Sequence, residues 1–174
     1  MDDEMFSSEL MDRCVDGAIA YAKAQVDAGC DTIGIGDAIV SQVSAPMYES
    51  LVFAHEKRLV DAIHEMGVLV RLHICGNINH LLPSITELGI DIIDFDWQVD
   101  MELARRLLGS QVTLTGNLDP VENVMRSEPK RIRQELLEIY KKVGNPYFVN
   151  AGCEVPVGTP LENLRALCEP IEAI

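Results

Sequence analysis

The stretch VLVRLHICGN, residues 68–77, decides how this chain folds. Its apolar first half is typical of a buried strand, but the run ends in a histidine, a cysteine and a glycine. Because side chains alternate faces along a strand, His73 and Cys75 project to the same side. Gly76 then lets the backbone turn away directly after them. Two soft donor atoms on one side of a strand end resemble half of a metal site.

Helical and strand-like segments alternate on both sides of this stretch. Helical patterns that end in glycine are followed by short runs rich in β-formers, which predicts parallel strands joined by helical crossovers. The predicted strands are residues 31–37, 68–75, 91–96, 111–117 and 147–153. The predicted helices are residues 8–28, 46–66, 78–88, 100–108 and 128–143, and a last helix with Thr159 as N-cap and Pro160 at its first position.

This order predicts an α/β fold of about five parallel βα units in a single domain, residues 1–174. An eight-stranded (β/α)8 barrel of the TIM type needs ~200–250 residues or more, so the chain holds a partial barrel. Either the sheet stays open or something else completes it. Reactive groups gather at the carboxyl ends of parallel strands, where this chain has polar or small residues. They are Asp37, Cys75, Asp96, Asn117 and Cys153.

Composition limits the kinds of partner and the cellular compartment that we expect for this chain. Fourteen Lys and Arg against 28 Asp and Glu give a net charge of −14, which repels phosphate backbones, so we expect no nucleic-acid partner. The apolar runs are shorter than the ~20 residues of a membrane span, so we expect no membrane insertion. The acidic start MDDEMFSSEL lacks a secretory-signal pattern, which predicts a cytoplasmic protein.

The five cysteines are expected to be thiols, because a reducing compartment does not favour a disulfide framework. Cysteines within or at the ends of helix-like segments are expected to be small apolar filler. These are Cys14, Cys30 and Cys168.

The cysteines at strand ends suggest a different role. With His73, the thiols of Cys75 and Cys153 would give zinc three protein ligands and leave the fourth position for water or substrate. The alternative is a core histidine near two unrelated cysteines, because no local CxxC pair is present.

Longer stretches resemble a known superfamily. LHICGN, followed downstream by NAGCEVPVGTPLENLRAL, is similar to the His-x-Cys…Cys pattern of corrinoid-dependent methyltransferases, of the methylcobamide:coenzyme M type, in the uroporphyrinogen decarboxylase superfamily. GDAIVSQVSAPMYESLVFAHEKRLVDAIHEMG and TGNLDPVENV resemble that superfamily in order and separation. The resemblance covers nearly the whole chain but only the C-terminal part of the family's barrel. GNLDP is shared with true decarboxylases, whereas His-x-Cys…Cys is specific to the methyltransferase branch.

The resemblance implies a zinc-dependent enzyme that moves a methyl group from a methylated corrinoid protein to a small thiol such as coenzyme M. Zn²⁺ would be held by His73, Cys75 and Cys153, and the methylcorrinoid would be the methyl donor. The ligand set suits this chemistry, because coordinating thiols are deprotonated and two thiolates with a neutral imidazole cancel the charge of Zn²⁺. A substrate thiolate would make the centre anionic and stay nucleophilic enough to attack a methyl group.

Polar residues at the same edge are candidates for catalytic or supporting roles. Asp37 either receives a ring N–H from His73, approaches the metal, or serves as a helix N-cap or turn residue. Asp96 either orients a ligand or substrate or simply ends its strand. Asn117 offers an amide to the rim, after a glycine that permits close backbone approach. Glu154 is a candidate fourth metal ligand when substrate is absent.

Arg71 has the same strand parity as His73, so it is expected inside the barrel while the alternate apolar residues pack against helices. A guanidinium suits a planar anion or sulfonate, which makes Arg71 a candidate for binding the cofactor or substrate. A structural ion pair with Asp94 or Asp96 is the alternative.

Two other functions stay open. A decarboxylase-like enzyme acting on a porphyrinogen would need no zinc and no His-x-Cys…Cys triad. A partial barrel that binds metal or a partner chain without catalysis is the third interpretation. Five βα units leave two strand edges and apolar positions without neighbours, unless terminal helices cover them. We therefore expect a homo-oligomer, or completion of the barrel by a second chain.

Overall fold

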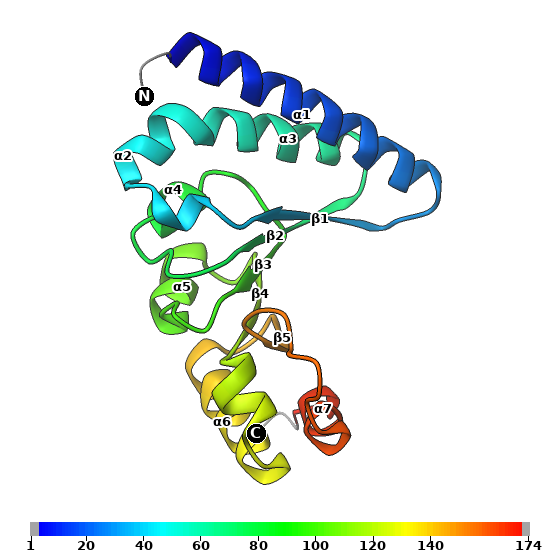
Figure 1. The fold of residues 1–174 in the computed structure, drawn as a ribbon, viewed down its shortest axis with the longest axis vertical. Helices are drawn as coiled ribbons and strands as arrows, with labels where there is room; N and C mark the ends of the chain where they lie inside the picture. The colour runs from blue at the N-terminus through cyan, green and yellow to red at the C-terminus, as the bar shows by residue number, and fades with distance from the viewer. Residues whose placement is uncertain (1–3, 172–174) are drawn as a thin grey trace.

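Parallel strands in sequence order form the central sheet (Figure 1). In this computed structural model, which describes residues 4–171, the sheet has five strands in the order β1-β2-β3-β4-β5. They are β1 (Thr32–Asp37), β2 (Leu69–Ile74), β3 (Ile92–Phe95), β4 (Thr113–Leu118) and β5 (Tyr147–Ala151). Each strand pairs in parallel with the next one along the chain, which confirms the predicted α/β fold of βα units.

Helices and helical turns connect the strands. They are α1 (Glu4–Asp27), η1 (Val40–Gln42), α2 (Ala45–Met47), η2 (Tyr48–Val52), α3 (Phe53–Glu65), α4 (Leu82–Ile85), α5 (Met101–Leu108), η3 (Pro120–Met125), α6 (Pro129–Val143) and α7 (Leu161–Cys168). Helices α1 and α3 lie side by side at one end of the molecule, and α6 and α7 lie side by side at the other (Figure 1). The sheet lies between these two ends (Figure 1).

Strand β2 shows how alternation divides the sheet into two faces. Val70, Leu72 and Ile74 are fully buried in the main hydrophobic core. Arg71 and His73 point to the opposite face and are only partly buried. This confirms the predicted parity, because Arg71 and His73 lie on the face opposite the main core.

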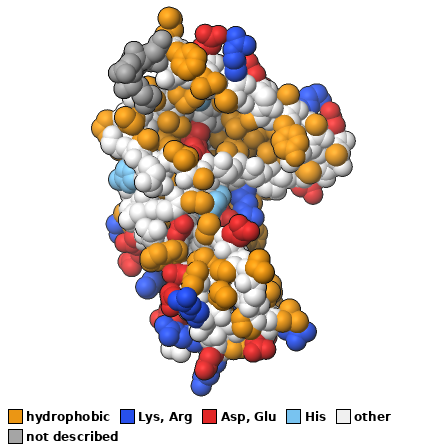
Figure 2. All heavy atoms as spheres, in the orientation of Figure 1, with side chains coloured by type: hydrophobic (Ala, Val, Ile, Leu, Met, Phe, Trp, Pro, Cys, Tyr) orange, Lys and Arg blue, Asp and Glu red, His pale blue; other side chains and the backbone are white. Residues whose placement is uncertain are grey.

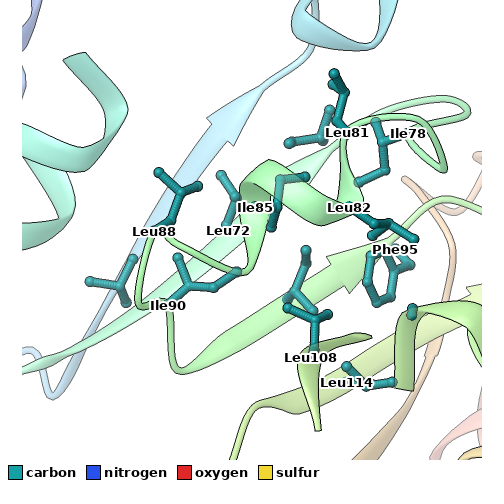
Figure 3. Packing of buried hydrophobic residues seen from close by; sticks show 14 of the residues in the cluster. Leu72, Ile78, Leu81, Leu82, Ile85, Leu88, Ile90, Phe95, Leu108 and Leu114 are labelled. Carbon is teal, nitrogen blue, oxygen red and sulfur yellow. The ribbon is translucent and has the colours of Figure 1, made fainter. Parts of the chain in front are cut away.

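The main core fills the space between the sheet and the segments that follow β2 and β3. Figure 3 shows side chains from β2, the α4 region, β3, α5 and β4 pointing toward one another. The labelled residues are Leu72, Ile78, Leu81, Leu82, Ile85, Leu88, Ile90, Phe95, Leu108 and Leu114. Each large buried side chain contributes about 1.5–3 kcal/mol, so this cluster holds the strands that carry the candidate ligands.

A second core joins β4 and β5 to the helices at the other end of the molecule. Its buried residues are Leu118, Val124, Ile132, Leu136, Ala151, Ala166 and Leu167. This cluster anchors β5, and β5 leads directly into Cys153.

Three local predictions were wrong. The helix predicted over 78–88 is α-helical only in α4, because Pro83 lacks an N–H and is tolerated only in a first helical turn. The last helix starts at Leu161 with Pro160 as its N-cap, and the Thr159 hydroxyl donates to the carbonyl of Pro156 at 2.8 Å instead of capping. The cysteines predicted as filler are exposed, because they lie on the outward sides of their helices and turns; they are Cys14, Cys30 and Cys168.

Apolar side chains also reach the surface. Figure 2 shows hydrophobic side chains on the visible face over the end of the molecule formed by α1 and α3. No helix in the described part of the chain has both the length and the apolar character needed to cross a membrane.

Candidate metal centre

Three soft donor atoms meet at the carboxyl edge of the sheet. His73 lies near the end of β2, Cys75 follows β2, and Cys153 follows β5. Strands β2 and β5 are separated by two other strands, about 14 Å in a flat sheet, so the donors can meet only because the sheet curves. Their ligand atoms all lie within 4.8 Å of one another. The structure therefore brings together the three residues that the sequence singled out.

The spacing of the donors fits zinc. A tetrahedral zinc ion, bound at about 2.3 Å to sulfur and about 2.0–2.1 Å to nitrogen, holds two sulfurs about 3.8 Å apart and a sulfur and a nitrogen about 3.6 Å apart. The two Sγ atoms are 3.8 Å apart. Nε2 of His73 lies 3.2 Å from Sγ of Cys75 and 3.9 Å from Sγ of Cys153. The sulfur separation is also far too long for a disulfide, which requires about 2.05 Å.

The imidazole of His73 has its lone pair on the correct nitrogen. Nδ1 lies 3.0 Å from the carbonyl oxygen of Asp94, and a carbonyl oxygen can only accept. Nδ1 therefore carries the hydrogen, and Nε2 presents its lone pair to the sulfurs. A backbone carbonyl that fixes the tautomer in this way is the usual outer partner of a metal-binding histidine.

The thiols lie in an acidic, partly buried setting. The pKa of the Cys75 thiol is raised to about 11, chiefly by burial and in addition by the neighbouring Cys153, Asp96 and Asp94. A bound divalent cation reverses this effect, because a coordinating thiol is deprotonated. The three donors line a pocket of about 390 Å³. Its other lining residues are Asp94, Asn150, Ala151 and Glu154.

Arg71 forms an ion pair with Asp94, which is the structural alternative that the sequence left open. The other carboxylate oxygen of Asp94 accepts from the side-chain amide of Asn150 at 3.2 Å. The carbonyl of Asp94 also accepts the His73 ring N–H. Asp94 thus links β2 to β5 next to the candidate ligands. The Arg71 side chain remains 42% exposed on this face.

Asp37 does not receive the ring N–H of His73, which goes to Asp94 instead. One carboxylate oxygen of Asp37 accepts from the backbone N–H groups of Ile39 and Val40, at 3.1 and 3.0 Å. This is the predicted alternative of a turn residue, because the carboxylate bonds backbone N–H groups two and three residues ahead, directly after β1.

Asn117 does not offer its amide to the rim. Its Nδ2 donates to backbone carbonyls of the loop after β3, including that of Val99 at 2.9 Å. The predicted close approach before it is confirmed, because a Cβ on Gly116 would lie 2.5 Å from the carbonyl oxygen of Phe95. Glu154 is exposed and lines the pocket, but among the described residues the metal-binding group consists only of the histidine and the two cysteines.

The sequence named Asp94 only as a possible partner of Arg71 and missed its contact with His73, and it missed the roles of Asn150 and Gly152. Asp94 pairs in register with His73, so the strand register was the signal that would have identified it. Asn150 and Gly152 carry no such signal, because their roles depend on how β5 curves toward β3.

A buried acid lies near Asp37. The Tyr48 hydroxyl donates to Glu56 at 2.5 Å, and the second carboxylate oxygen of Glu56 has no partner among the described residues. The pKa of Glu56 is raised to about 7, because burial and the charge of Asp37 together outweigh the opposing hydrogen bond from Tyr48. Burial also raises the pKa of Tyr48. The fold therefore favours the protonated form of Glu56.

We expect stability to fall as pH rises through 7. Because the folded pKa of Glu56 exceeds its unfolded value of 4.5, its contribution is complete below pH 4.5 and is lost as pH rises through about 7. The full difference corresponds to roughly 3 kcal/mol. Glu56→Gln keeps a neutral acceptor for Tyr48, so its melting temperature should change less than that of the unmodified protein across this range. If the melting temperatures of Glu56→Gln and of the unmodified protein changed equally with pH, the expectation would be wrong.

Comparison with known proteins places the chain in a family. The family model described as "Uroporphyrinogen decarboxylase (URO-D)" matches residues 2–174. The methylcobamide:CoM methyltransferase MtbA of Methanosarcina mazei is 34% identical over 163 residues, which are 92% of this chain and 47% of that protein. The uroporphyrinogen decarboxylase of Carboxydothermus hydrogenoformans is 32% identical over 168 residues, 95% of this chain and 47% of that protein.

A solved structure has the same fold. It is a methyltransferase from Methanosarcina mazei, with a TM-score of 0.83 at 24% identity, and the match covers 92% of this chain and 47% of that one. The chain spans about half the length of the relatives it matches. Methyltransferases and decarboxylases match almost equally well, so the similarity extends to the family and not to one activity. The chain belongs to the uroporphyrinogen decarboxylase (URO-D) family.

Proposed function

We propose that this chain is the metal-binding part of a methyltransferase that moves a methyl group from a methylated corrinoid, carried by a corrinoid protein, to a small thiol such as coenzyme M. The observation that supports it is the convergence of one imidazole and two thiols at separations that suit tetrahedral zinc. His73, Cys75 and Cys153 would hold the metal and leave one position for the acceptor thiol.

Zinc bound there would select the anion of the acceptor thiol and keep its sulfur nucleophilic. In the overall step a carbon–sulfur bond forms, the cobalt–carbon bond breaks with its electron pair left on cobalt, and the thiol proton goes to solvent. The protein's own residues prepare the site, because the Asp94 carbonyl holds His73 in the tautomer that frees Nε2. The open pocket beside the sulfurs admits the acceptor.

Arg71 stays a proposed anion-binding residue. Despite its ion pair with Asp94, the Arg71 side chain is 42% exposed on the face of the sheet that carries His73. A guanidinium has five N–H donors, so one carboxylate does not saturate it. An acceptor thiol with an acidic group would gain a second attachment there. Asp37, Asp96 and Asn117 remain proposed contributors through the backbone segments that they fix.

A porphyrinogen decarboxylase is the second candidate, and 32% identity to such an enzyme favours it. A partial barrel that binds metal or a partner chain without catalysis is the third, and the grouping of His73, Cys75 and Cys153 is compatible with it. A decarboxylase does not explain why two thiols and an imidazole converge, and a metal site without catalysis gives the open pocket beside them no role. The methyl-transfer proposal explains both the donors and the pocket.

Methyl transfer from methylcobalamin to a panel of small thiols tests the proposal. We expect zinc-dependent formation of a methyl thioether with loss of methylcobalamin, by the chain alone or mixed with a polypeptide carrying the N-terminal barrel units. Cys153→Ser should abolish the reaction. Decarboxylation of a porphyrinogen without zinc would support the second candidate, and zinc binding with no turnover of either substrate would support the third.

A further inference from the structure

The loop after β3 lies between the two candidate cysteine ligands. We define the spacer segment as residues 96–99, which link β3 to α5. One carboxylate oxygen of Asp96 accepts from the backbone N–H of Gly76 at 2.8 Å. Gly76 directly follows Cys75 and has a φ of +86°, so it forms the turn that ends β2. Asp96 therefore fixes the backbone that carries the Cys75 thiol.

The same segment sets the position of the other cysteine. Gly152 directly precedes Cys153 and packs on the backbone of the spacer segment. A Cβ at position 152 would lie 2.5 Å from the backbone nitrogen of Trp97 and 3.0 Å from the carbonyl carbon of Asp96. These are backbone atoms, which cannot shift without disturbing the spacer segment, so only glycine permits this approach. The contact brings the end of β5 close enough for Cys153 to reach the other donors.

The spacer segment is held in place by Asn117 on the neighbouring strand β4. Nδ2 of Asn117 donates to the carbonyl oxygen of Val99 at 2.9 Å and to that of Asp96 at 3.3 Å. The Val99 N–H donates to the same Asp96 carbonyl at 3.1 Å. A segment fixed by these bonds can act as a spacer of defined thickness between β2 and β5.

Burial of the Asp96 carboxylate is unfavourable for the stability of the fold. It is only 6% exposed, and its second carboxylate oxygen has no hydrogen-bond partner within residues 4–171. Leaving a buried carboxylate oxygen unpaired costs stability, and a cation bound beside it lowers that cost. The other oxygen of the same carboxylate bonds the Gly76 N–H, directly after Cys75, so Asp96 lies beside the strand end that carries a candidate ligand.

We propose that Asp96 and Gly152 are positioning residues of the metal centre: Asp96 sets Cys75 through the Gly76 N–H, and Gly152 lets Cys153 approach across the spacer segment. This inference rests on the proposed function, because it takes the three donors to be metal ligands. Neither residue touches the metal or the substrate. Their effect should appear in metal affinity and in the geometry of the site.

The chain offers a matched control for each residue. Asp91 precedes β3 as Asp96 follows it, and it accepts from the backbone N–H of Val70, at the other end of β2, at the same distance of 2.8 Å. Asp91→Ala thus removes an equivalent strand-to-strand bond, together with a contact to His64, at the end of β2 away from the sulfurs. Gly34 lies in β1, where an added Cβ would meet open space, and its φ is an ordinary one, so Gly34→Ala adds the same methyl group without a clash.

The test measures zinc affinity by chelator competition and the absorption spectrum of the Co²⁺-substituted protein. We expect Asp96→Ala and Gly152→Ala each to weaken zinc binding by about 10–100-fold, the range typical for loss of an outer partner, and to alter the sulfur-to-cobalt bands. Asp96→Asn keeps an oxygen for the Gly76 N–H and should retain most of the affinity. Asp91→Ala and Gly34→Ala should bind zinc as the unmodified protein does.

Zinc affinity and cobalt spectra that are unchanged in both Asp96→Ala and Gly152→Ala would overturn this inference alone. Equal losses in the control variants would also overturn it, because general loosening of the fold would then explain the effect. If one of Asp96→Ala and Gly152→Ala fails to fold, the zinc affinity and cobalt spectrum of the other variant decide the test. Failure of the unmodified protein to bind zinc would overturn the proposed metal centre, and this inference with it.

Discussion

Cys75→Ala is expected to reduce the zinc content of the purified protein from near one equivalent to a trace. The variant removes one of three donors that lie within 4.8 Å of one another and leaves a histidine and a single thiol. Loss of a direct ligand should exceed the ~10–100-fold loss of affinity that follows removal of an outer partner. Metal analysis after equilibrium dialysis measures the effect, and methyl transfer to thiols should disappear with the metal.

The other cysteines provide the control. Cys168 is exposed at the end of α7 and belongs to no metal-binding group in the described residues, so Cys168→Ala should keep its zinc. This comparison separates loss of a ligand from loss of a thiol. Full zinc retention by Cys75→Ala would remove the basis of the proposed function.

The sequence predicted the donors because strand alternation is a local rule. Residues two apart on β2 share a face whatever the rest of the chain does, so His73 and Cys75 were paired by parity alone. The same rule predicted that Arg71 lies on the pocket face. Cys153 was added from its place at the end of a later strand and from the family resemblance. Its distance to the other two depends on the curvature of the sheet, which no local pattern encodes.

The supporting residues were predicted less well because their roles depend on register and backbone contacts. Asp37 and Asn117 were assigned to the rim from their place at strand ends, yet both use their polar atoms on neighbouring backbone. The partner of His73 is a backbone carbonyl, and every residue has one, so residue type gives no signal. Gly152 acts by lacking a side chain, which becomes visible only when the spacer segment is placed beside it.

The polypeptide of residues 1–174 is expected to self-associate or to bind a second chain that supplies further barrel units. Within the described residues, β1 and β5 each pair with one strand only, so each has a free edge. Beside β1 lies a hollow of about 280 Å³ between α1 and the strand, and Tyr21 at its rim is 69% exposed. Phe148 on β5 is 59% exposed. Open edges with apolar neighbours pair readily with other chains.

Sedimentation at micromolar concentration tests this expectation. A charged side chain beside an open edge opposes strand pairing, so Tyr21→Lys or Phe148→Lys should shift the assembly toward monomer, according to which edge is used. Leu107→Lys introduces the same charge on α5, away from both edges, and should leave the assembly unchanged. A monodisperse monomer with cooperative unfolding would show that the curved sheet is stable with its edges open. The metal site would then need no second chain to hold β2 and β5 at their present separation, because the spacer segment and the two cores would be sufficient.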